Sequence, residues 1–363
     1  VSVILVKNTQ TALEALAHFY RMKFDIPVVA VTGYNGKTTT KNMIAALVAS
    51  KLNVCATQKN FNNEILSRME DSAVVAGNGR LAVTTDSFVV NPLFFPGGDI
   101  GKLSVCGTVN DLLMSGACPK YLTCGFILEE GADSEELEKI AASMAQTARE
   151  AGVTIVAGDT KVIEGSGGIY INTAGVGFVP EGVQISASLC EEGDAVLVSG
   201  NLGDHHAAIL SARMEITNSI VSDCAPLGEM VRSMQEAGVR IKAMRDVTRG
   251  GLATVLHEFA AASDCCVELT QSCLPVSDQV KGFCGLLGLD PLYMGNEGKM
   301  TAVVAGEDAE LALSCMQKSK YGEAAAIIGH ISGKERGKVL LTTPLGGIRV
   351  ITELIGEGLP RIC

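Results

Sequence analysis

The chain ends on Cys363, so a thiol and the α-carboxylate share its last residue. The adjacent negative charge disfavours a thiolate, and the free thiol should therefore ionise reluctantly. Pro360 restricts the backbone shortly before Cys363, while Gly356 and Gly358 allow the backbone to bend. At about 3.3–3.6 Å per residue, the segment from Gly356 onward could reach roughly 23–25 Å. We interpret this segment as a flexible tail that carries the thiol; the alternative is an ordinary frayed terminus.

Four aspartates form a second group that could do chemistry. Asp71, Asp86, Asp111 and Asp159 are each expected at a strand end or a helix start. Brought together without a cation, they would repel one another strongly at low dielectric. Oxygen ligands suit Mg²⁺, which usually bridges carboxylates to substrate phosphates. The pattern predicts a magnesium site for phosphoryl chemistry; the alternative is that each Asp only caps a helix or a turn.

A glycine-rich loop near the front of the chain has the composition of a phosphate cradle. It follows the apolar strand 26–31, and it carries Gly33, Gly36, Lys37 and Thr38. Backbone N–H groups and a helix N-terminus would hold the anion, Lys37 would supply charge, and Thr38 a magnesium ligand. A second strand-to-helix turn, Arg245–Gly251, is a weaker anion-binding candidate.

Apolar runs and turn residues predict the elements that position these groups. Asp86 ends the second strand of a hairpin, and Asp159 and Lys161 follow a strand directly. His205 and His206 have no partners at metal-ligand spacing, so we expect surface or capping residues. Strands are expected at Leu81–Thr85, Tyr121–Leu128, Val153–Ala157, Ile169–Val179, Asp194–Ser199, Val239–Met244 and Thr342–Val350. Helices are expected at Ser134–Gly152, Pro226–Ala237, Leu252–Ala262 and Asp308–Lys318, from Ala207, and as a short turn at Ile351–Gly356.

Composition excludes several classes of function. The 363 residues carry 29 basic and 40 acidic side chains, a net charge of −11 without a basic cluster, so nucleic-acid binding is not expected. We see no membrane-spanning run and no secretory leader, so we expect a cytoplasmic protein. The twelve cysteines are scattered, which favours reduced, mostly buried thiols apart from the last one.

Residues 1–65 resemble the start of the central ATPase domain of Mur ligases, most closely the MurF type. The similarity lies in Thr32–Thr39 and in the run from Asn60 to Ile65, and it then stops. A lone β-α-β piece of this length cannot bury both faces of a sheet. We interpret it as a truncated P-loop fragment without a working site.

Residues from about 66 to 363 resemble the HypE family of hydrogenase maturation factors. The terminal cysteine is the most diagnostic feature, because the related PurM-like enzymes share the ATP-site aspartates without it. The matching stretches are 70–74, 84–90, 92–101, 109–117, 158–162, 246–252, 296–299 and the tail 360–363.

The resemblance implies an α/β fold of α+β layers, with two PurM-like domains and a flexible C-terminal tail, preceded by the truncated P-loop β-α-β fragment. The implied boundaries are 1–65 for the fragment, 66–185 for an ATP-binding and dimerisation domain, 186–345 for an α/β domain, and 346–363 for the tail.

The resemblance also implies the reaction and the partners. HypF carbamoylates the thiol of Cys363, and the tail then folds into the ATP site of its own protein. ATP drives dehydration of the carbamoyl group to a thiocyanate, and the cyano group passes to iron on the HypC–HypD complex for the [NiFe] centre. A homodimer is expected.

By motif, the resemblance assigns ATP and Mg²⁺ to Asp71, Asp86, Asp111 and Asp159, with Asn110 beside them. Lys161 would act with Cys363 in catalysis by stabilising charge or assisting proton removal. Asp246, Arg249 and Glu297 would hold the tail.

Two departures from the family pattern leave alternatives open. The family's glycine-rich opening His-Gly-x-Gly-Gly is missing, and its Gly-Asp-His-Gly reads Gly203-Asp204-His205-His206, which puts a bulky residue at a turn. One alternative is a non-catalytic carrier that docks to HypF or HypC–HypD without ATP turnover. Another is a Mur-type ligase, which would require residues 1–65 to bind ATP alone.

Overall fold

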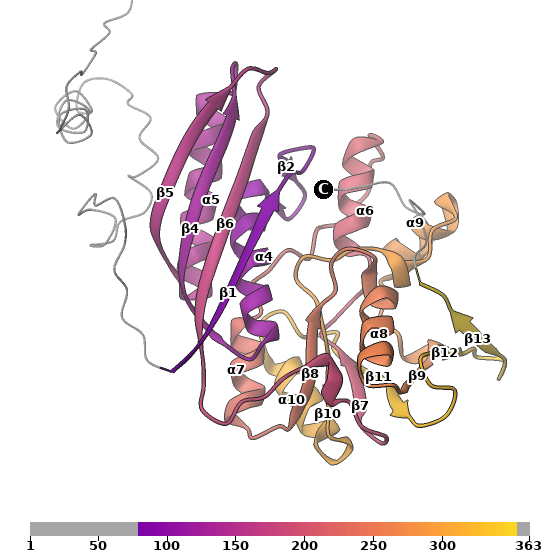
Figure 1. The fold of residues 1–363 in the computed structure, drawn as a ribbon. Helices are drawn as coiled ribbons and strands as arrows, with labels where there is room; N and C mark the ends of the chain where they lie inside the picture. The colour runs from indigo at the N-terminus through magenta and orange to yellow at the C-terminus, as the bar shows by residue number, and fades with distance from the viewer. Residues whose placement is uncertain (1–78, 354–363) are drawn as a thin grey trace, which may run out of the picture. The chain divides into compact units, whose positions relative to one another are not determined.

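A computed structural model of the chain describes residues 79–353. In this part, two α/β domains follow one another, each built on its own sheet (Figure 1), which confirms the expected fold class. Several predictions concern residues outside the described range: Gly33, Gly36, Lys37, Thr38, Asp71 and Cys363.

The first domain is a four-stranded sheet in the order β1-β6-β4-β5, covered on one face by α4 and α5 (Figure 1). Strands β4 and β5 are parallel, and the other neighbours are antiparallel. The strands are β1 (Arg80–Phe88), β4 (Cys118–Glu129), β5 (Thr154–Ile163) and β6 (Ile169–Val179), with a small ribbon of β2 (Phe94–Phe95) and β3 (Gly98–Asp99). The helices are α4 (Ile100–Met114) and α5 (Ser134–Ala151).

Helix α5 shows how the local sequence forms these elements. Asp133 caps its N-terminus by accepting hydrogen bonds from the backbone N–H groups of Glu135 and Glu136, and Gly152 ends it with a φ of 70°. Ile140, Met144 and Ala148 lie four residues apart and are buried, so one face of the helix packs on the sheet and on α4.

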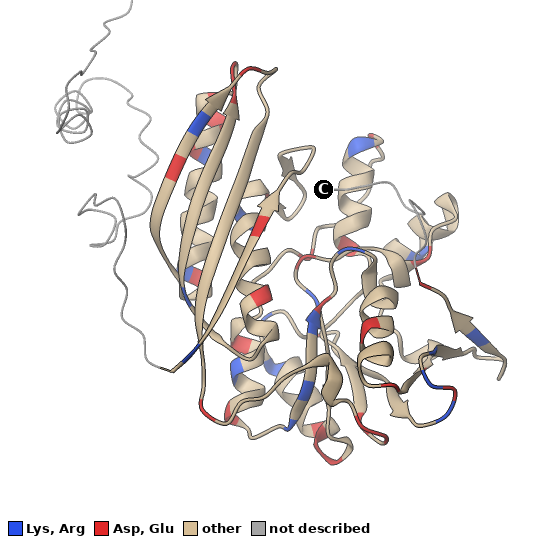
Figure 2. Cartoon of the chain, in the orientation of Figure 1, with Lys and Arg blue, Asp and Glu red and all other residues tan. Residues whose placement is uncertain are grey.

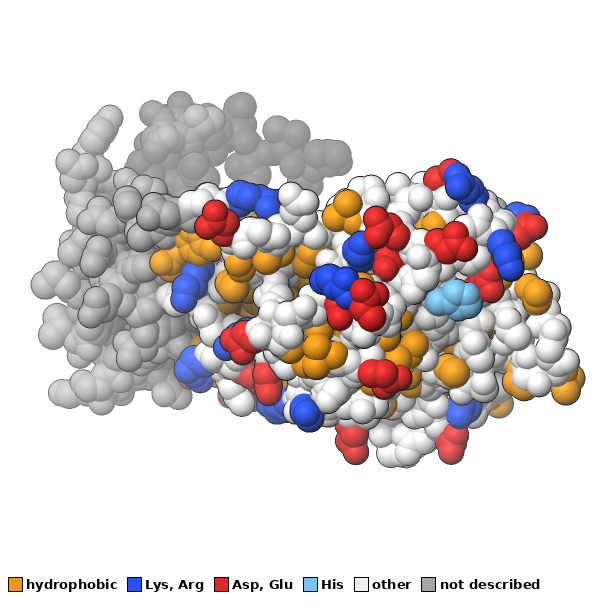
Figure 3. Space-filling view, turned by 90° about the horizontal axis from the view of Figure 1, so that it is seen from below, with side chains coloured by type: hydrophobic (Ala, Val, Ile, Leu, Met, Phe, Trp, Pro, Cys, Tyr) orange, Lys and Arg blue, Asp and Glu red, His pale blue; other side chains and the backbone are white. Residues whose placement is uncertain are grey.

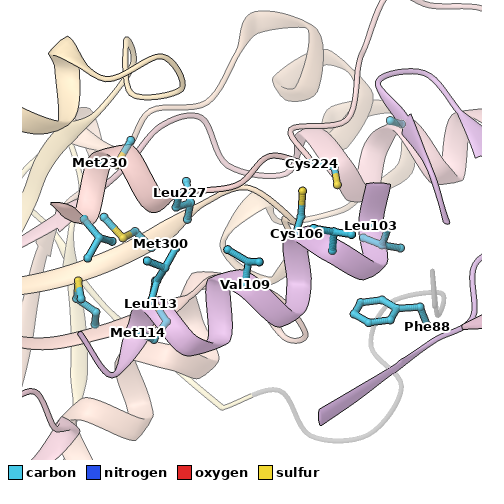
Figure 4. Packing of buried hydrophobic residues seen from close by; sticks show 14 of the residues in the cluster. Phe88, Leu103, Cys106, Val109, Leu113, Met114, Cys224, Leu227, Met230 and Met300 are labelled. Atoms are coloured by element: carbon cyan, nitrogen blue, oxygen red, sulfur yellow. The ribbon is translucent and has the colours of Figure 1, made fainter. Parts of the chain in front are cut away.

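Helix α4 differs because almost all of its residues are buried, which places it inside the molecule. Its apolar residues pack against the sheet of the first domain and also against the second domain. Figure 4 shows Val109 and Leu113 of α4 near Leu227 and Met300, and Cys106 of α4 near Cys224. The two domains therefore share one continuous apolar core around this helix.

The second domain is a seven-stranded sheet in the order β13-β12-β9-β11-β7-β10-β8, in which only β12 and β9 are parallel neighbours. In β7, Ala195 and Leu197 join one core and Val196 and Val198 the other, so both faces of the sheet are covered. The strands are β7 (Ala195–Val198), β8 (Ile241–Asp246), β9 (Cys266–Thr270), β10 (Met300–Val304), β11 (Ala326–Ser332), β12 (Val339–Thr342) and β13 (Ile348–Ile351). The α-helices are α6 (Asp204–Arg213), α7 (Gly228–Glu236), α8 (Gly251–Ala262), α9 (Asp278–Leu287) and α10 (Ala309–Lys318). Short 3₁₀ turns lie at Ala187–Leu189, Gln271–Cys273, Pro291–Tyr293 and Gly306–Asp308.

Several expected placements were wrong. Strand β1 continues to Phe88, so Asp86 lies inside it and not at its end, and Asp111 lies in the last turn of α4 and not at a helix start. The strand expected to end at Ala157 continues to Ile163, so Asp159 and Lys161 lie inside β5 and not after it. The single strand expected at 342–350 is a hairpin of β12 and β13, because residues 343–347 form a turn closed by hydrogen bonds between Thr343 and Gly347. The helical turn expected from Ile351 is also wrong at its start, since Ile351 pairs with Val339 in β13. The predicted tail region, 346–363, thus includes one strand of the sheet.

The expectation of surface histidines was also wrong. His205 and His206 lie in the first turn of α6, and they are 0 and 4% exposed. His205 shares a 2.7 Å hydrogen bond with the Ser222 hydroxyl and meets the edge of the Phe95 ring of the first domain. Burial lowers the pKa of both imidazoles to about 4. His206 thus occupies a helical position, and the turn glycine is Gly203, whose φ is 88°.

The surface is mixed in charge. On the face shown in Figure 3, acidic and basic side chains alternate with small apolar areas. Among residues 79–353, no helix is long and apolar enough to cross a membrane.

Candidate active site between the two domains

A cavity of about 490 Å³ lies where the first strand, the end of α4 and β8 of the second domain meet. Its walls combine apolar side chains with Thr84, Asp111, Arg245 and Asp246. Figure 2 shows acidic residues on β1 and α4 and basic residues on β8 around this region. We call this cavity the interdomain groove.

Asp111 lines the first-domain side of the groove, and Asp86 lies near enough to it for the two charges to interact. Asp86 pairs in register with the buried Thr173, so its side chain points to the helix-covered face, above Gly107 of α4. The Thr84 hydroxyl donates a 2.9 Å hydrogen bond to Oδ2 of Asp111. Burial raises the pKa of both carboxylates, and the negative charge of Asp86 raises that of Asp111 further. The structure therefore brings two of the four predicted aspartates together.

The second domain adds two more acids to this site. Asp246 ends β8, and burial raises its pKa to about 7, with further contributions from Asp111 and Asp86. Burial also raises the pKa of Glu297 well above its usual value, and the charges of Asp246 and Asp86 add to this effect. Arg249 is near enough to Asp86 to lower that residue's pKa. The three residues predicted to hold the tail thus face the predicted ATP-binding aspartates.

Asn110 is 2% exposed and turns away from the groove. Its amide donates hydrogen bonds to the carbonyls of Ala225 (3.1 Å) and Glu297 (3.5 Å), and its oxygen accepts one from the N–H of Leu227 (3.0 Å). In this structure the side chain ties α4 to two loops of the second domain. A direct contact of Asn110 with ATP stays a prediction.

Asp159 and Lys161 lie elsewhere. They form an ion pair at 2.8 Å in β5, with side chains 68 and 72% exposed, and the hydrogen bond from Lys161 lowers the pKa of Asp159. Strands β1 and β5 are the two edges of the sheet. Asp159 pairs with Gly125, which pairs with Asn172, so its side chain points to the face opposite the helices. Within one chain, these two residues are therefore separated from Asp86 and Asp111 by both the width and the thickness of the sheet.

The arrangement suits a cation held jointly with phosphate, and not a closed protein cage. Among residues 79–353, no three Asp, Glu, His or Cys side chains lie close enough to hold a metal ion. Asp86 and Asp111 provide two neighbouring oxygen ligands whose repulsion a cation would relieve. Mg²⁺ is commonly bound by one or two carboxylates together with substrate phosphates, so the residues present fit it.

Sequence reasoning gave no individual role to several groups at this site. Thr84 orients Asp111, Arg245 lines the groove, and Asp223 and Lys299 form an ion pair at 3.6 Å behind Glu297. Thr84, Arg245 and Lys299 lie inside stretches that were recognised, Arg245 as the first residue of the anion-binding candidate Arg245–Gly251, so their charges and hydroxyls were the available signal. Asp223 lies in a stretch without a recognisable pattern.

Comparisons with known proteins agree with this geometry. Residues 69–179 match the N-terminal domain of AIR synthase related proteins, and residues 191–342 match the C-terminal domain of the same group. Residues 31–83 match the Mur ligase middle domain, in keeping with the resemblance of the front segment.

Curated relatives and solved structures extend the match over most of the chain. Carbamoyl dehydratase HypE of Rhodobacter capsulatus is 45% identical over 302 residues, covering 82% of this chain and 88% of that protein. The HypE of Escherichia coli (strain K12) is 46% identical over 313 residues, covering 84% and 92%. A crystal structure of hydrogenase maturation protein HypE in complex with ATP is 44% identical with a TM-score of 0.82, covering 88% of this chain and 96% of that one. The structure of a HypE–HypF complex is 46% identical with a TM-score of 0.73, covering 82% and 97%. On this identity, maintained across both domains, the chain belongs to the HypE family.

Proposed function

We infer that the chain is an ATP-dependent carbamoyl dehydratase of hydrogenase maturation. It converts a carbamoyl group on the thiol of Cys363 into a thiocyanate, whose cyano group goes to iron of a [NiFe] hydrogenase. The observation that carries this function is the 45–46% identity to carbamoyl dehydratases HypE, with 88 and 92% of their lengths covered. ATP binding follows from the same family, since a HypE has been crystallised with ATP.

We propose that the interdomain groove is where the nucleotide phosphates and the tail meet. Asp86 and Asp111 would hold Mg²⁺ there, which when bound would neutralise phosphate charge and orient the transferred group. Asp71 lies outside the described residues and is proposed as a further ligand by motif. Arg245 supplies positive charge on the opposite wall, and Arg249 lies near enough to Asp86 to act on its charge.

The reaction sets what the side chains must do. The carboxamide oxygen on sulfur takes the terminal phosphoryl group of ATP, and ADP leaves. The C–O bond then breaks and phosphate departs, while the nitrogen loses both of its protons, which gives S–C≡N. The protons need an acceptor, and the oxygen needs a nearby positive charge. We propose Lys161 for the charge or for assistance in proton removal, and Glu297 and Asp246 as groups that hold the tail at the groove.

The separation of Lys161 from the groove points to a second copy of the chain. The uncovered face of the first-domain sheet presents apolar side chains: Leu81, Val83, Ile127 and Ile163 are 55, 70, 41 and 45% exposed. An apolar face of this kind marks a protein–protein interface. We propose a two-fold homodimer packed through this face, in which Asp159 and Lys161 of one copy complete the groove of the other.

We further propose that HypF is the carbamoyl donor and the HypC–HypD complex the cyanide acceptor. Support for the first comes from the solved HypE–HypF complex, whose HypE-like part matches this chain. The cytoplasm is the proposed compartment, because the cysteines in the described part are free thiols, as a reducing environment requires.

Mass spectrometry of the C-terminal peptide tests the function. The full chain is incubated with HypF, carbamoyl phosphate and ATP, and the peptide carrying Cys363 is followed with time. A carbamoyl adduct that then loses one water, together with phosphate release, is expected. A stable adduct without loss of water would contradict a dehydratase and favour a carrier. Cys363→Ser, which lacks the thiol, should acquire neither adduct.

A further inference from the structure

The loop Asn296–Lys299 carries Glu297 close to Asp246, which lines the groove, and the first residue of the loop is fixed by a complete set of hydrogen bonds. Asn296 is fully buried. Its oxygen accepts a 2.8 Å hydrogen bond from the N–H of Gly203, and its amide donates to the carbonyls of Val247 and Met294 at 3.1 Å each. This side chain anchors the loop on one side of Glu297.

Asp223 binds the loop on the other side of Glu297. Its Oδ1 accepts a 3.1 Å hydrogen bond from the backbone N–H of Glu297, and its Oδ2 lies 3.6 Å from Nζ of Lys299. Nζ of Lys299 in turn donates to the carbonyl of Gly298 at 3.1 Å. A Cβ at Gly298 would overlap the carbonyl of Asp223, so the two segments are in backbone contact. Asp223 therefore holds the residue before Gly298 and the residue after it.

The ion pair between Asp223 and Lys299 is buried, so its two side chains tolerate little rearrangement. The side chains of Lys299 and Asp223 are only 9 and 3% exposed. The stem of Lys299 lies across Gly200, where a Cβ would come within 2.9 Å of Cε. The lysine also acts on Asp204: burial and the charge of Asp223 raise the pKa of that carboxyl to about 6, and the charge of Lys299 opposes this rise. Loss of either partner would leave an uncompensated charge in the interior, which proteins avoid.

Glu297 itself has no such restraint on its carboxylate. Among residues 79–353, no hydrogen-bond donor or cation pairs with it directly; its backbone alone is held, by Asp223, Ala225 and Asn110. The charged groups that face it are Asp86 of β1, Asp246 of β8 and Asp223, together with the thiol of Cys224. The position of this carboxylate therefore depends on how firmly the backbone beneath it is held.

We propose that the buried Asp223–Lys299 ion pair is a positioning device that fixes the Glu297 carboxylate next to Asp246 and Asp86, beside the interdomain groove, for the dehydration step. The inference rests on the proposed function, because it names a role in that reaction. Asp223 acts through Glu297 and touches no reacting atom. A small displacement of a group at the reacting centre can lower a rate by about a hundredfold.

A double-mutant cycle with single-turnover kinetics tests the proposal. The full chain is carbamoylated by HypF, ATP is added, and loss of water from the Cys363 adduct is timed. Asp223→Ala should slow this step about tenfold to a hundredfold while the KM for ATP stays within about twofold. Asp223→Asn keeps the acceptor for the Glu297 N–H and should recover part of the rate. In a Glu297→Gln background, Asp223→Ala should have little further effect, because interacting residues are not additive.

Asp204→Asn is the matched control. Asp204 lies in the same charged cluster but bonds to the Ser277 hydroxyl and not to the loop. This variant should keep the wild-type rate, and thermal unfolding of every variant separates slow chemistry from partial unfolding. If Asp223→Ala does not fold, the cycle is run with Asp223→Asn.

Three results would overturn the proposal. An unchanged rate for Asp223→Ala would do so, as would an equal slowing in the wild-type and Glu297→Gln backgrounds, or an Asp204→Asn variant as slow as Asp223→Ala. If the wild-type adduct loses no water at all, the proposed function fails and the positioning role fails with it. If the wild type turns over and the cycle is additive, the positioning role alone is wrong.

Discussion

A dimer built from two different inactive chains can show whether Lys161 serves its own groove or that of its partner. One chain carries Lys161→Ala and the other Asp111→Asn. Each variant alone is expected to be inactive, because the first lacks the proposed charge at the carboxamide and the second lacks a ligand at the groove. The structure predicts what happens when one copy of each is combined.

The distance across the sheet makes the prediction definite. Strands β1 and β5 are the outer strands of the order β1-β6-β4-β5, so three strand spacings separate their backbones. At about 4.8 Å each, this amounts to roughly 14 Å, before the opposite orientation of the side chains is counted. A lysine side chain does not cross that gap around the sheet. Lys161 can act in catalysis only at another copy's groove, provided the strand order is kept.

The mixed dimer should therefore regain activity. One of its two grooves has both residues intact, one from each chain, and the other groove has neither. With two equivalent sites in a two-fold dimer, phosphate release per dimer should be about half of the wild-type value. The mixed dimer is obtained by co-expression with two affinity tags, sequential purification and sizing, and it is carbamoylated by HypF before ATP is added.

The reciprocal combination gives the opposite outcome and serves as the control. A wild-type chain paired with a chain carrying both substitutions should be almost inactive, since each groove then contains one altered residue. If Lys161 acted within its own chain, the first dimer would stay inactive and the second would keep about half the activity. That pattern would refute both the proposed interface and the placement of Lys161.

Three further predictions test separate parts of the chain. Burial raises the pKa of Asp246 from 3.8 to about 7, so the folded chain keeps a proton that the unfolded chain has lost, and stability should fall through this window by up to about 4 kcal/mol as the pH rises. Asp246→Asn should reduce that fall, as measured by urea denaturation at about pH 5 and about pH 8, while Asp86, Asp111 and Glu297, whose pKa values burial also raises, keep their share. Asn110→Ala should lower the free energy of unfolding by about 2–4 kcal/mol, because it leaves buried backbone groups of two loops unpaired, whereas the exposed Gln279→Ala should cost less than about 0.5 kcal/mol. Lys37→Ala should leave ATP binding by calorimetry unchanged while Asp86→Asn weakens it; the reverse result would favour the Mur-type reading of the front segment.

Elements with a strong local pattern could be predicted from the sequence, and those that depend on pairing could not. Helix α5 has a capping Asp133, a terminating Gly152 and apolar residues four apart, so its limits were predicted to within one residue. The hairpin of β12 and β13 was predicted as one strand although Pro344 and the pair Gly346-Gly347 are turn residues, so the reversal was readable and was overlooked. The extension of β5 to Ile163 was not readable, because it depends on pairing with β4.

The candidate site was predictable in its residue types and less so in its arrangement. Motif similarity found Asp86, Asp111, Asp246 and Glu297, which the structure brings close together, with Asp111 and Asp246 lining the groove. It could not separate Asp159 from them, because the side to which a strand residue points depends on register, and the place of β5 three positions from β1 in the sheet gives no signal in the sequence. The burial of the two histidines could not be predicted for a similar reason. His205 packs against Phe95, which lies about a hundred residues earlier in the chain.

The pair Asn110-Asp111 explains how one helix can serve both the fold and the chemistry. Successive residues on an α-helix point about 100° apart, so two neighbours can face different partners. Asn110 faces the second domain and binds the loops that contain Leu227 and Glu297, whereas Asp111 faces the groove beside Thr84. The spacing between the Asp111 carboxylate and Glu297 is thus fixed through a single turn of α4. Because that turn also lies in the core shared by both domains, the groove cannot change shape without disturbing the packing of Val109 and Leu113. The fold therefore determines the position of the helix, and the contributions proposed for Cys363 and for a second copy of the chain must fit against it.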